Sequence, residues 1–203
     1  MRSEELKLQI VQVARKHFAL HGFQGTSLKE VAAEAQVAGS LINYHFRDKE
    51  GLFHSCISNF ARDRVAAIRR IVGEVRNREE VRVRLELFVE EMLASMVADP
   101  YGFDIIQREV RSGNPAVIEL FQETLMVAFD GVVDFFKSCQ QLGLLRENLE
   151  PTMAAILLFS STGDMARLDV LTKRFLNASL TDEAWRQRFS KHVVELFMNG
   201  VIK

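Results

Sequence analysis

Cysteine is scarce in this sequence. The 203-residue chain has only Cys56 and Cys139, and each lies among apolar residues at helical spacing. A free cysteine in such surroundings usually behaves as a small buried apolar side chain. Two such thiols predict neither a disulfide framework nor a metal site, and no Gly-rich nucleotide motif indicates a cofactor. We therefore expect a protein without disulfides, metals or cofactors.

Long apolar runs are missing as well. Residues 1–20 mix charged and apolar residues throughout and do not have the pattern of a signal peptide. No run in the sequence approaches the roughly 18 apolar residues that a membrane span requires. Strand-like alternation, internal repeats and low-complexity segments are also absent from the sequence. We expect a globular, cytoplasmic protein without a membrane partner.

The sequence has no excess of positive charge either. Lysine and arginine total 26 against 27 aspartate and glutamate, which gives a net charge of −1. Within residues 1–50, seven basic side chains face six acidic ones. Many DNA-binding domains are strongly basic. Any contact with DNA here must therefore depend on a few well-placed charges and on backbone N–H groups at helix starts.

Apolar residues recur at helical spacing along most of the sequence. They make up 48% of the residues, which is enough for a substantial core. Glycine, proline and capping residues divide this periodicity into segments. We predict an all-α protein of about nine helices. Eight cover residues 4–21, 28–35, 39–44, 48–72, 79–98, 103–111, 115–142 and 183–200, and one more begins at Pro151 and includes Asp164 and Arg167. Gly22 and Gly143 are expected to end helices, Asp48 and the stretch 181–183 to cap them, and Gly163 to mark a kink or break.

Residues 28–35 and 39–44 are two short predicted helices separated by a three-residue turn. Ser27 and Glu30 have the spacing of a capping box, which predicts a helix beginning at Leu28. Val37 fits the buried position of the turn. Two short helices at this spacing form a helix-turn-helix, whose second helix can lie in the major groove of DNA.

The turn, core and aromatic positions around this motif are Gly22, Thr26, Ser27, Val31, Ala32, Ala35, Val37, Ile42, Tyr44, His45, Phe46, Lys49 and Leu52. Over about residues 8–55 this pattern resembles the DNA-binding domain of the TetR family of transcriptional regulators. Three positions depart from the family pattern: Ala38 replaces the usual Ser or Thr cap, Ser40 a smaller residue, and Asn43 a frequent Tyr. Beyond residue 60, only the length and the all-helical layout agree with the family.

The resemblance implies an N-terminal three-helix DNA-binding domain, residues 1–50, joined to a larger helical effector-binding and dimerisation domain, residues 51–203. It also implies a homodimer that binds a palindromic double-stranded DNA operator. The DNA-contacting residues carried over from the family are Thr26, Ser27, Lys29, Gly39, Ser40, Asn43, Tyr44, His45 and Lys49. Packing between the third and fourth helices is the alternative role for Tyr44 and His45.

The larger part of the sequence has weaker chemical signals. Arg108 and Glu109 are sequence neighbours that do not share a helix face, and no His-rich motif accompanies them, so we predict no catalytic residues and no enzyme. Proteins of the resembled family usually bind a small effector between the helices of this domain. The candidate ligand-binding residues are Phe88, Met92, Phe103, Arg108, Phe121, Phe129, Asp164 and Met165, with core packing or ion pairing as the alternative. Fifteen phenylalanines against two tyrosines favour an apolar or acyl-like ligand.

Apolar residues on nearly every face of residues 154–159 favour a helix buried between its own subunit and another surface. The candidate dimer-interface residues on the last two predicted helices are Ala154, Leu157, Leu158, Phe189, Val193 and Phe197. The resulting hypothesis is a ligand-responsive homodimeric transcriptional regulator, a repressor that a small, apolar effector releases from its operator. Two alternatives stay open: a helical small-molecule-binding or interaction protein without specific DNA binding, and an activator with the same fold.

Overall fold

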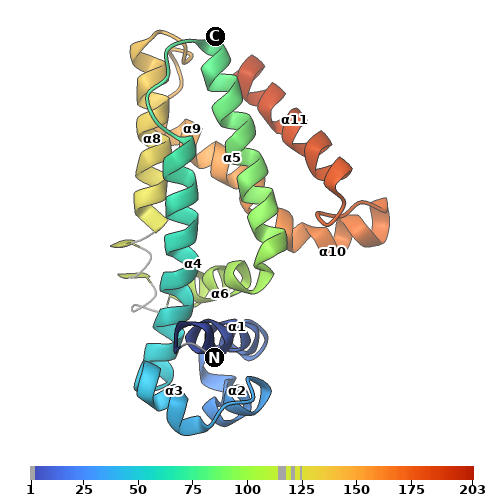
Figure 1. Ribbon diagram of the computed structural model, residues 1–203. Helices are drawn as coiled ribbons and strands as arrows, with labels where there is room; N and C mark the ends of the chain where they lie inside the picture. The colour runs from blue at the N-terminus through green and yellow to red at the C-terminus, as the bar shows by residue number, and fades with distance from the viewer. Residues whose placement is uncertain (1–2, 114–117, 120–121, 124) are drawn as a thin grey trace. The chain divides into compact units, whose positions relative to one another are not determined.

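The computed structural model describes residues 3–113, 118–119, 122–123 and 125–203, and its regular structure is helical throughout these ranges (Figure 1). The ten labelled helices are α1 (Ser3–Gly25), α2 (Leu28–Glu34), α3 (Gly39–Phe46), α4 (Lys49–Ile71), α5 (Arg78–Ala98), α6 (Pro100–Ser112), α8 (Leu125–Gln141), α9 (Pro151–Gly163), α10 (Met165–Leu176) and α11 (Glu183–Gly200). The predicted all-α fold is confirmed. Among the described helices, none combines the length and apolarity that crossing a bilayer demands.

Several helix boundaries lie where the sequence predicted them. Gly22 has φ 72° and ψ 176° and separates two helical stretches that are assigned together as α1. The Asp48 carboxylate accepts a hydrogen bond from the Gly51 N–H at 2.8 Å, and the Asp182 carboxylate accepts one from the Ala184 N–H at 3.0 Å. Such bonds satisfy N–H groups that have no acceptor within the first turn of a helix.

Three local predictions need correction or qualification. Ser27 occupies the N-cap of α2, but its side chain makes no capping bond, so the capping-box prediction is wrong. The chain does break at Gly163, and residues beyond it form α10, a separate helix that the periodicity did not predict. Of the helix predicted over 115–142, α8 covers the part from Leu125 to Gln141, while residues 114–117, 120, 121 and 124 lie outside the described residues.

The chain divides into two compact units. The first, called the head below, comprises residues 1–63 and 101–124, and the second, called the body, comprises residues 64–100 and 125–203. The head thus unites the helix-turn-helix with α6. Phe103 of α6 packs against Phe60 of α4, a residue that lies about forty positions earlier in the chain.

The body has an apolar core of its own. Helix α11 packs against α5, and α8 packs against α9. Phe88 of α5, Phe136 of α8, Leu158 of α9 and Val194 of α11 are each at most 1% exposed. Burying a side chain of this kind contributes roughly 1.5–3 kcal/mol. These four helices therefore share an apolar core within the body.

We predict that Asp182→Ala lowers the free energy of unfolding by about 1 kcal/mol. The reason is that α11 loses the acceptor that Asp182 offers to the N–H groups of Ala184 and Trp185. Urea denaturation followed by circular dichroism measures the loss. Asp182→Asn keeps an acceptor oxygen and is the matched control, so an equal loss in both variants would show that the cap is not the cause.

Candidate nucleic-acid interface

An apolar core shared by α1, α2, α3 and α4 holds the helix-turn-helix in place. Phe18 of α1, Val31 of α2, Ile42 and Phe46 of α3, and Leu52 of α4 belong to one buried cluster, and none is more than 8% exposed. Ile42 and Phe46 are one helical turn apart, so both point inward from the same side of α3. This packing determines which side of α3 faces outward.

The outward side of α3 carries the residues that were predicted to read bases. Gly39, Ser40 and Asn43 are exposed, and Tyr44 is 80% exposed. Such exposure excludes packing between α3 and α4 as the role of Tyr44. An amide side chain such as Asn43 presents a donor and an acceptor side by side, which matches the major-groove edge of adenine.

The turn between α2 and α3 is fixed by hydrogen bonds. The Val37 N–H donates to the Ala32 carbonyl at 3.0 Å, and the side-chain amide of Gln9 in α1 donates to the Ala35 carbonyl at 2.9 Å. Gln36 adopts the left-handed region with φ 55°, which turns the chain toward α3. The angle between α2 and α3 is therefore held by contacts from three helices.

The three residues predicted to contact phosphates at the start of α2, Thr26, Ser27 and Lys29, differ in how exposed they are. Lys29 is exposed and Ser27 is partly exposed, so both reach the surface. Thr26 is only 3% exposed, and its hydroxyl donates to the Gly22 carbonyl at 2.8 Å. Thr26 is thus positioned to shape the segment before α2, while Ser27 and Lys29 are positioned to meet a ligand.

Lys49, at the start of α4, makes contacts inside the head. Its ammonium donates to the Gln24 carbonyl at 3.0 Å and lies 4.9 Å from the centre of the Phe23 ring. A lysine ammonium has three donors, so these contacts leave capacity for an anion as well. Lys49 therefore links the start of α4 to the segment that precedes α2.

A charged cluster on the head joins α1 to α2. The Glu34 carboxylate lies 2.7 Å from the Lys16 ammonium and 2.8 Å from the His17 ring nitrogen Nε2. The Lys16 hydrogen bond, followed by the His17 bond, lowers the pKa of Glu34, and the same Glu34 contact raises the pKa of Lys16. These ion pairs neutralise basic side chains within the protein, so they reduce the positive charge that is available to bind DNA.

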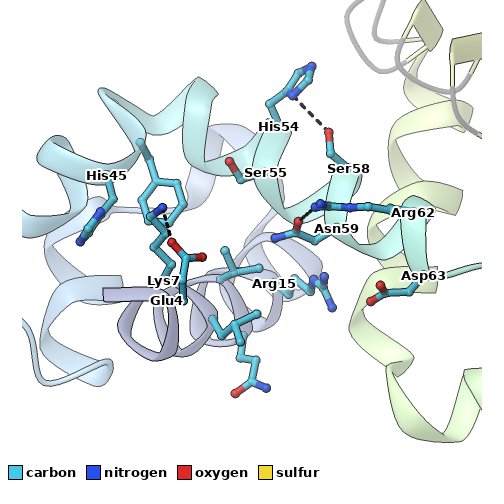
Figure 2. A pocket seen from close by; sticks show the side chains of 14 residues that line it. Glu4, Lys7, Arg15, His45, His54, Ser55, Ser58, Asn59, Arg62 and Asp63 are labelled. Atoms are coloured by element: carbon cyan, nitrogen blue, oxygen red, sulfur yellow. Dashed lines mark hydrogen bonds and ion pairs between the residues drawn. The ribbon is translucent and has the colours of Figure 1, made fainter. Parts of the chain in front are cut away.

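A groove of about 760 Å³ lies on the head between α1, the end of α3 and α4, and Figure 2 shows the side chains that line it. Basic and acidic side chains line it together: Lys7, Arg15, Arg62, His45 and His54 with Glu4 and Asp63. At one end, the Lys7 ammonium donates to Glu4 at 2.9 Å beside His45. His45, which was predicted to contact the DNA backbone, thus lies at the rim of this groove. Lys7, a basic residue beside it, was not predicted from the sequence.

Several of the predicted ligand-binding residues lie in the body. The Phe159 ring lies 5.3 Å from Phe88 and 5.8 Å from Phe129, so α5, α8 and α9 share an aromatic cluster. Met92 and Met165 are both 7% exposed. Phe159 was not among the predicted residues, although it follows Ala155 at one-turn spacing in the sequence. The cluster is apolar and is lined by three helices.

The remaining predicted ligand residues do not join this cluster. Asp164 is exposed and pairs with Arg167 at 3.0 Å. Phe103 and Arg108 belong to the head, where Phe103 packs edge to face on Phe60 and Arg108 donates to the Ala19 carbonyl at 3.1 Å. Phe121 lies outside the described residues.

The predicted dimer residues differ in accessibility. Ala154, Leu158, Val193 and Phe197 are at most 5% exposed within their own chain, and Phe189 is partly buried beside Trp185. Leu157 is 50% exposed on α9, close in sequence to Met153 at 50% and Ile156 at 42%, while Leu196 of α11 is 72% exposed. The predicted residue Leu157 is therefore an outward apolar position of α9, and the outward residues Met153, Ile156 and Leu196 lie one position or one turn from predicted ones.

Both cysteines are buried, as the sequence predicted. Burial raises the pKa of the Cys139 thiol to about 12, so it stays protonated near neutral pH. Within the described ranges, no group of three or more His, Cys, Asp or Glu side chains is arranged to hold a metal ion.

Comparison with known proteins agrees with this geometry. Residues 10–56 match the model of the bacterial regulatory proteins of the tetR family. The fatty acid metabolism regulator protein of Bacillus subtilis (strain 168) is 21% identical over 194 residues, which cover 96% of this chain and 94% of that protein.

Two solved structures share the fold over nearly their whole length. The fatty acid degradation regulator FadR from Bacillus halodurans has a TM-score of 0.75 and 20% identity, covering 96% of this chain and 95% of that one. FadR from Bacillus subtilis in complex with stearoyl-CoA has a TM-score of 0.74 and 19% identity, covering 95% and 98%. Because the family match spans the buried core and the outward face of α3, residues 10–56 form a DNA-binding domain of the tetR family of bacterial regulatory proteins, and the whole chain shares the helical fold of these solved regulators.

Proposed function

We propose that the protein is a homodimeric repressor that binds a palindromic operator through α3 and releases it when a long-chain acyl-CoA binds. The observation that supports the DNA-binding part most directly is the division of α3 into two sides. Ile42 and Phe46 are buried, while Ser40, Asn43 and Tyr44 are exposed. A short helix held this rigidly by its inner side can present its outer side to base edges.

In the proposed complex, each α3 lies in a major groove with Gly39, Ser40 and Asn43 toward the bases. Ser27 and Lys29, both at the surface, contact the phosphates that flank the groove. Tyr44, His45 and Lys49 lie along the DNA backbone. Two heads of a dimer would then engage half-sites about 34 Å apart, which is one turn of the duplex.

The proposed effector class rests on the relatives and on the body. The Bacillus subtilis relative is named as a fatty acid metabolism regulator, and one similar structure contains stearoyl-CoA. The aromatic cluster of Phe88, Phe129 and Phe159 offers an apolar environment that suits an acyl chain. An effector that binds one conformation of the dimer more tightly than another reduces DNA affinity by that difference.

We propose that the dimer forms through the outward sides of α9 and α11. Met153, Ile156 and Leu157 recur at helical spacing on α9, and Leu196 is exposed on α11. The buried residues Ala154, Leu158, Val193 and Phe197 support these helices from within. Because exposed apolar side chains of this kind are costly in water, covering them with a second copy is favourable.

We predict that Asn43→Ala relaxes base preference at one position of each half-site, by about 1–3 kcal/mol of discrimination. Lys29→Ala, the matched comparison, should weaken binding to all sequences alike and reduce the dependence of log K on log salt by about one unit. Selection of duplexes from a random library, followed by affinity measurements at several salt concentrations, tests both. An unchanged selected sequence after Asn43→Ala would remove Asn43 from the base-reading residues.

We predict that stearoyl-CoA raises the melting temperature and displaces the selected duplex, whereas free coenzyme A does neither at the same concentration. At a ligand concentration about 100 times its dissociation constant, binding to the folded state alone adds about 2.7 kcal/mol of stability. Differential scanning fluorimetry and fluorescence anisotropy measure the two effects. Stabilisation without release of DNA would contradict a repressor of this type, and absence of both effects would contradict the effector class.

We predict that Leu157→Lys converts the dimer to a monomer, because it places a charge at the centre of the proposed apolar interface. Leu142→Lys is the control, since Leu142 at the end of α8 is 48% exposed, almost as much as Leu157 at 50%. Size-exclusion chromatography with light scattering gives the mass directly. If the Leu157 variant keeps the mass of the wild type, α9 is not the dimer helix.

A further inference from the structure

Helix α6 is built into the head. Ile105 is 2% exposed and belongs to the same buried cluster as Phe18 and Ile42. Gly102 faces the Phe60 ring so closely that a Cβ at this position would overlap it, and the Phe103 ring lies 5.0 Å from Phe60 at 82°. These contacts of Gly102, Phe103 and Ile105 fix the position of α6 on α1 and α4.

From this position Arg108 reaches the end of the first stretch of α1. Its guanidinium Nη1 donates to the carbonyl of Ala19 at 3.1 Å and lies 3.5 Å from the carbonyl of Leu20. Carbonyls in the last turn of a helix lack N–H donors within it and carry partial negative charge. A cation from a distant helix therefore caps the chain just before Gly22.

Gly22 accommodates this cap in two ways. Its φ of 72° is a conformation that L side chains rarely adopt. A Cβ at this position would also lie 3.0 Å from both Cζ and Nη2 of Arg108, which is closer than ordinary packing allows. The guanidinium thus packs directly against the backbone of the glycine, and a side chain at residue 22 would require it to shift.

The same short segment is held at two further points. The Thr26 hydroxyl donates to the Gly22 carbonyl at 2.8 Å, and the Lys49 ammonium donates to the Gln24 carbonyl at 3.0 Å. Residues 19–26 are therefore tied to α6, to themselves and to α4. This segment leads without interruption to Ser27 and Lys29, the proposed phosphate contacts.

We propose that Arg108 is a positioning residue for DNA binding: by capping the carbonyls of Ala19 and Leu20 over Gly22, it holds residues 19–26 so that the start of α2 meets the DNA backbone. This inference deepens the proposed function and rests on it for the link to DNA. The sequence analysis placed Arg108 among the effector-binding residues. The proposal instead gives Arg108 a role in positioning residues 19–26 within the head. The affinity for DNA then depends on where α6 sits on α1.

The test compares Arg108→Met with Arg111→Met. Methionine keeps an unbranched apolar stem and removes the guanidinium, and the exposed Arg111 lies one turn further along α6. Hydrogen exchange of the DNA-free proteins, read by mass spectrometry, should show faster exchange over residues 19–26 for Arg108→Met only. Affinity for the selected duplex should fall about tenfold for the same variant, since a hydrogen bond from a charged donor is lost.

The salt dependence of DNA affinity distinguishes a residue that positions the DNA-binding segment from one that contacts a phosphate directly. A side chain that neutralises a phosphate contributes about one unit to the slope of log K against log salt. Arg108→Met should keep the wild-type slope while losing affinity, and its affinity for stearoyl-CoA should equal that of Arg111→Met. Arg108→Lys should restore part of the DNA affinity, because an ammonium can still reach one carbonyl.

Three results would overturn the proposal: unchanged exchange over residues 19–26, a DNA affinity within twofold of wild type, or a slope reduced by about one unit, which would make Arg108 a direct phosphate contact. Failure of the proposed function gives a different result. If the wild-type protein selects no duplex at all, the DNA-binding role falls, and the exchange comparison still shows whether Arg108 holds the segment.

Discussion

The burial of Ile42 and Phe46 is the constraint on which the DNA-binding geometry depends. Both side chains enter the cluster that includes Phe18, Val31 and Leu52, so α3 cannot rotate about its axis without exposing large apolar surface. The outward side of α3 is consequently fixed. A helix of eight residues would not be stable alone, and its order comes from this packing.

The sequence predicted the helix-turn-helix because its signals are local. Val31 and Ala32 face inward at helical spacing, Gly22 takes a positive φ, and Asp48 caps α4. The capping box failed because Ser27 occupies the N-cap of α2 but its side chain makes no cap bond, while the neighbouring Thr26 hydroxyl donates to the Gly22 carbonyl. Spacing alone does not show whether a side chain at the N-cap makes its capping bond.

Non-local packing explains what the sequence could not predict. The close approach of Gly102 to Phe60 and of Arg108 to Gly22 joins residues about 42 and 86 positions apart, and no periodicity records such pairs. In the same way, the apolar pattern of α9 does not indicate which of its residues are buried by the rest of the chain and which stay exposed. Leu158 is buried by the body, whereas its neighbour Leu157 remains half exposed. Each of these facts depends on tertiary contacts that a single sequence leaves open.

Charge in the head is used as much for internal order as for a ligand. Lys16 pairs with Glu34, Lys7 with Glu4, and Lys49 with a backbone carbonyl. In the proposed dimer, two linked heads would bind one duplex far more tightly than one head alone.

The most direct measurement is a hydroxyl-radical footprint of the protein on its selected duplex. Two equal protected regions, related by a two-fold axis and separated by about one turn of the duplex, are predicted for a dimer that places one α3 in each of two successive major grooves. A single protected region, or protection without a defined position, would contradict paired, sequence-specific recognition by α3.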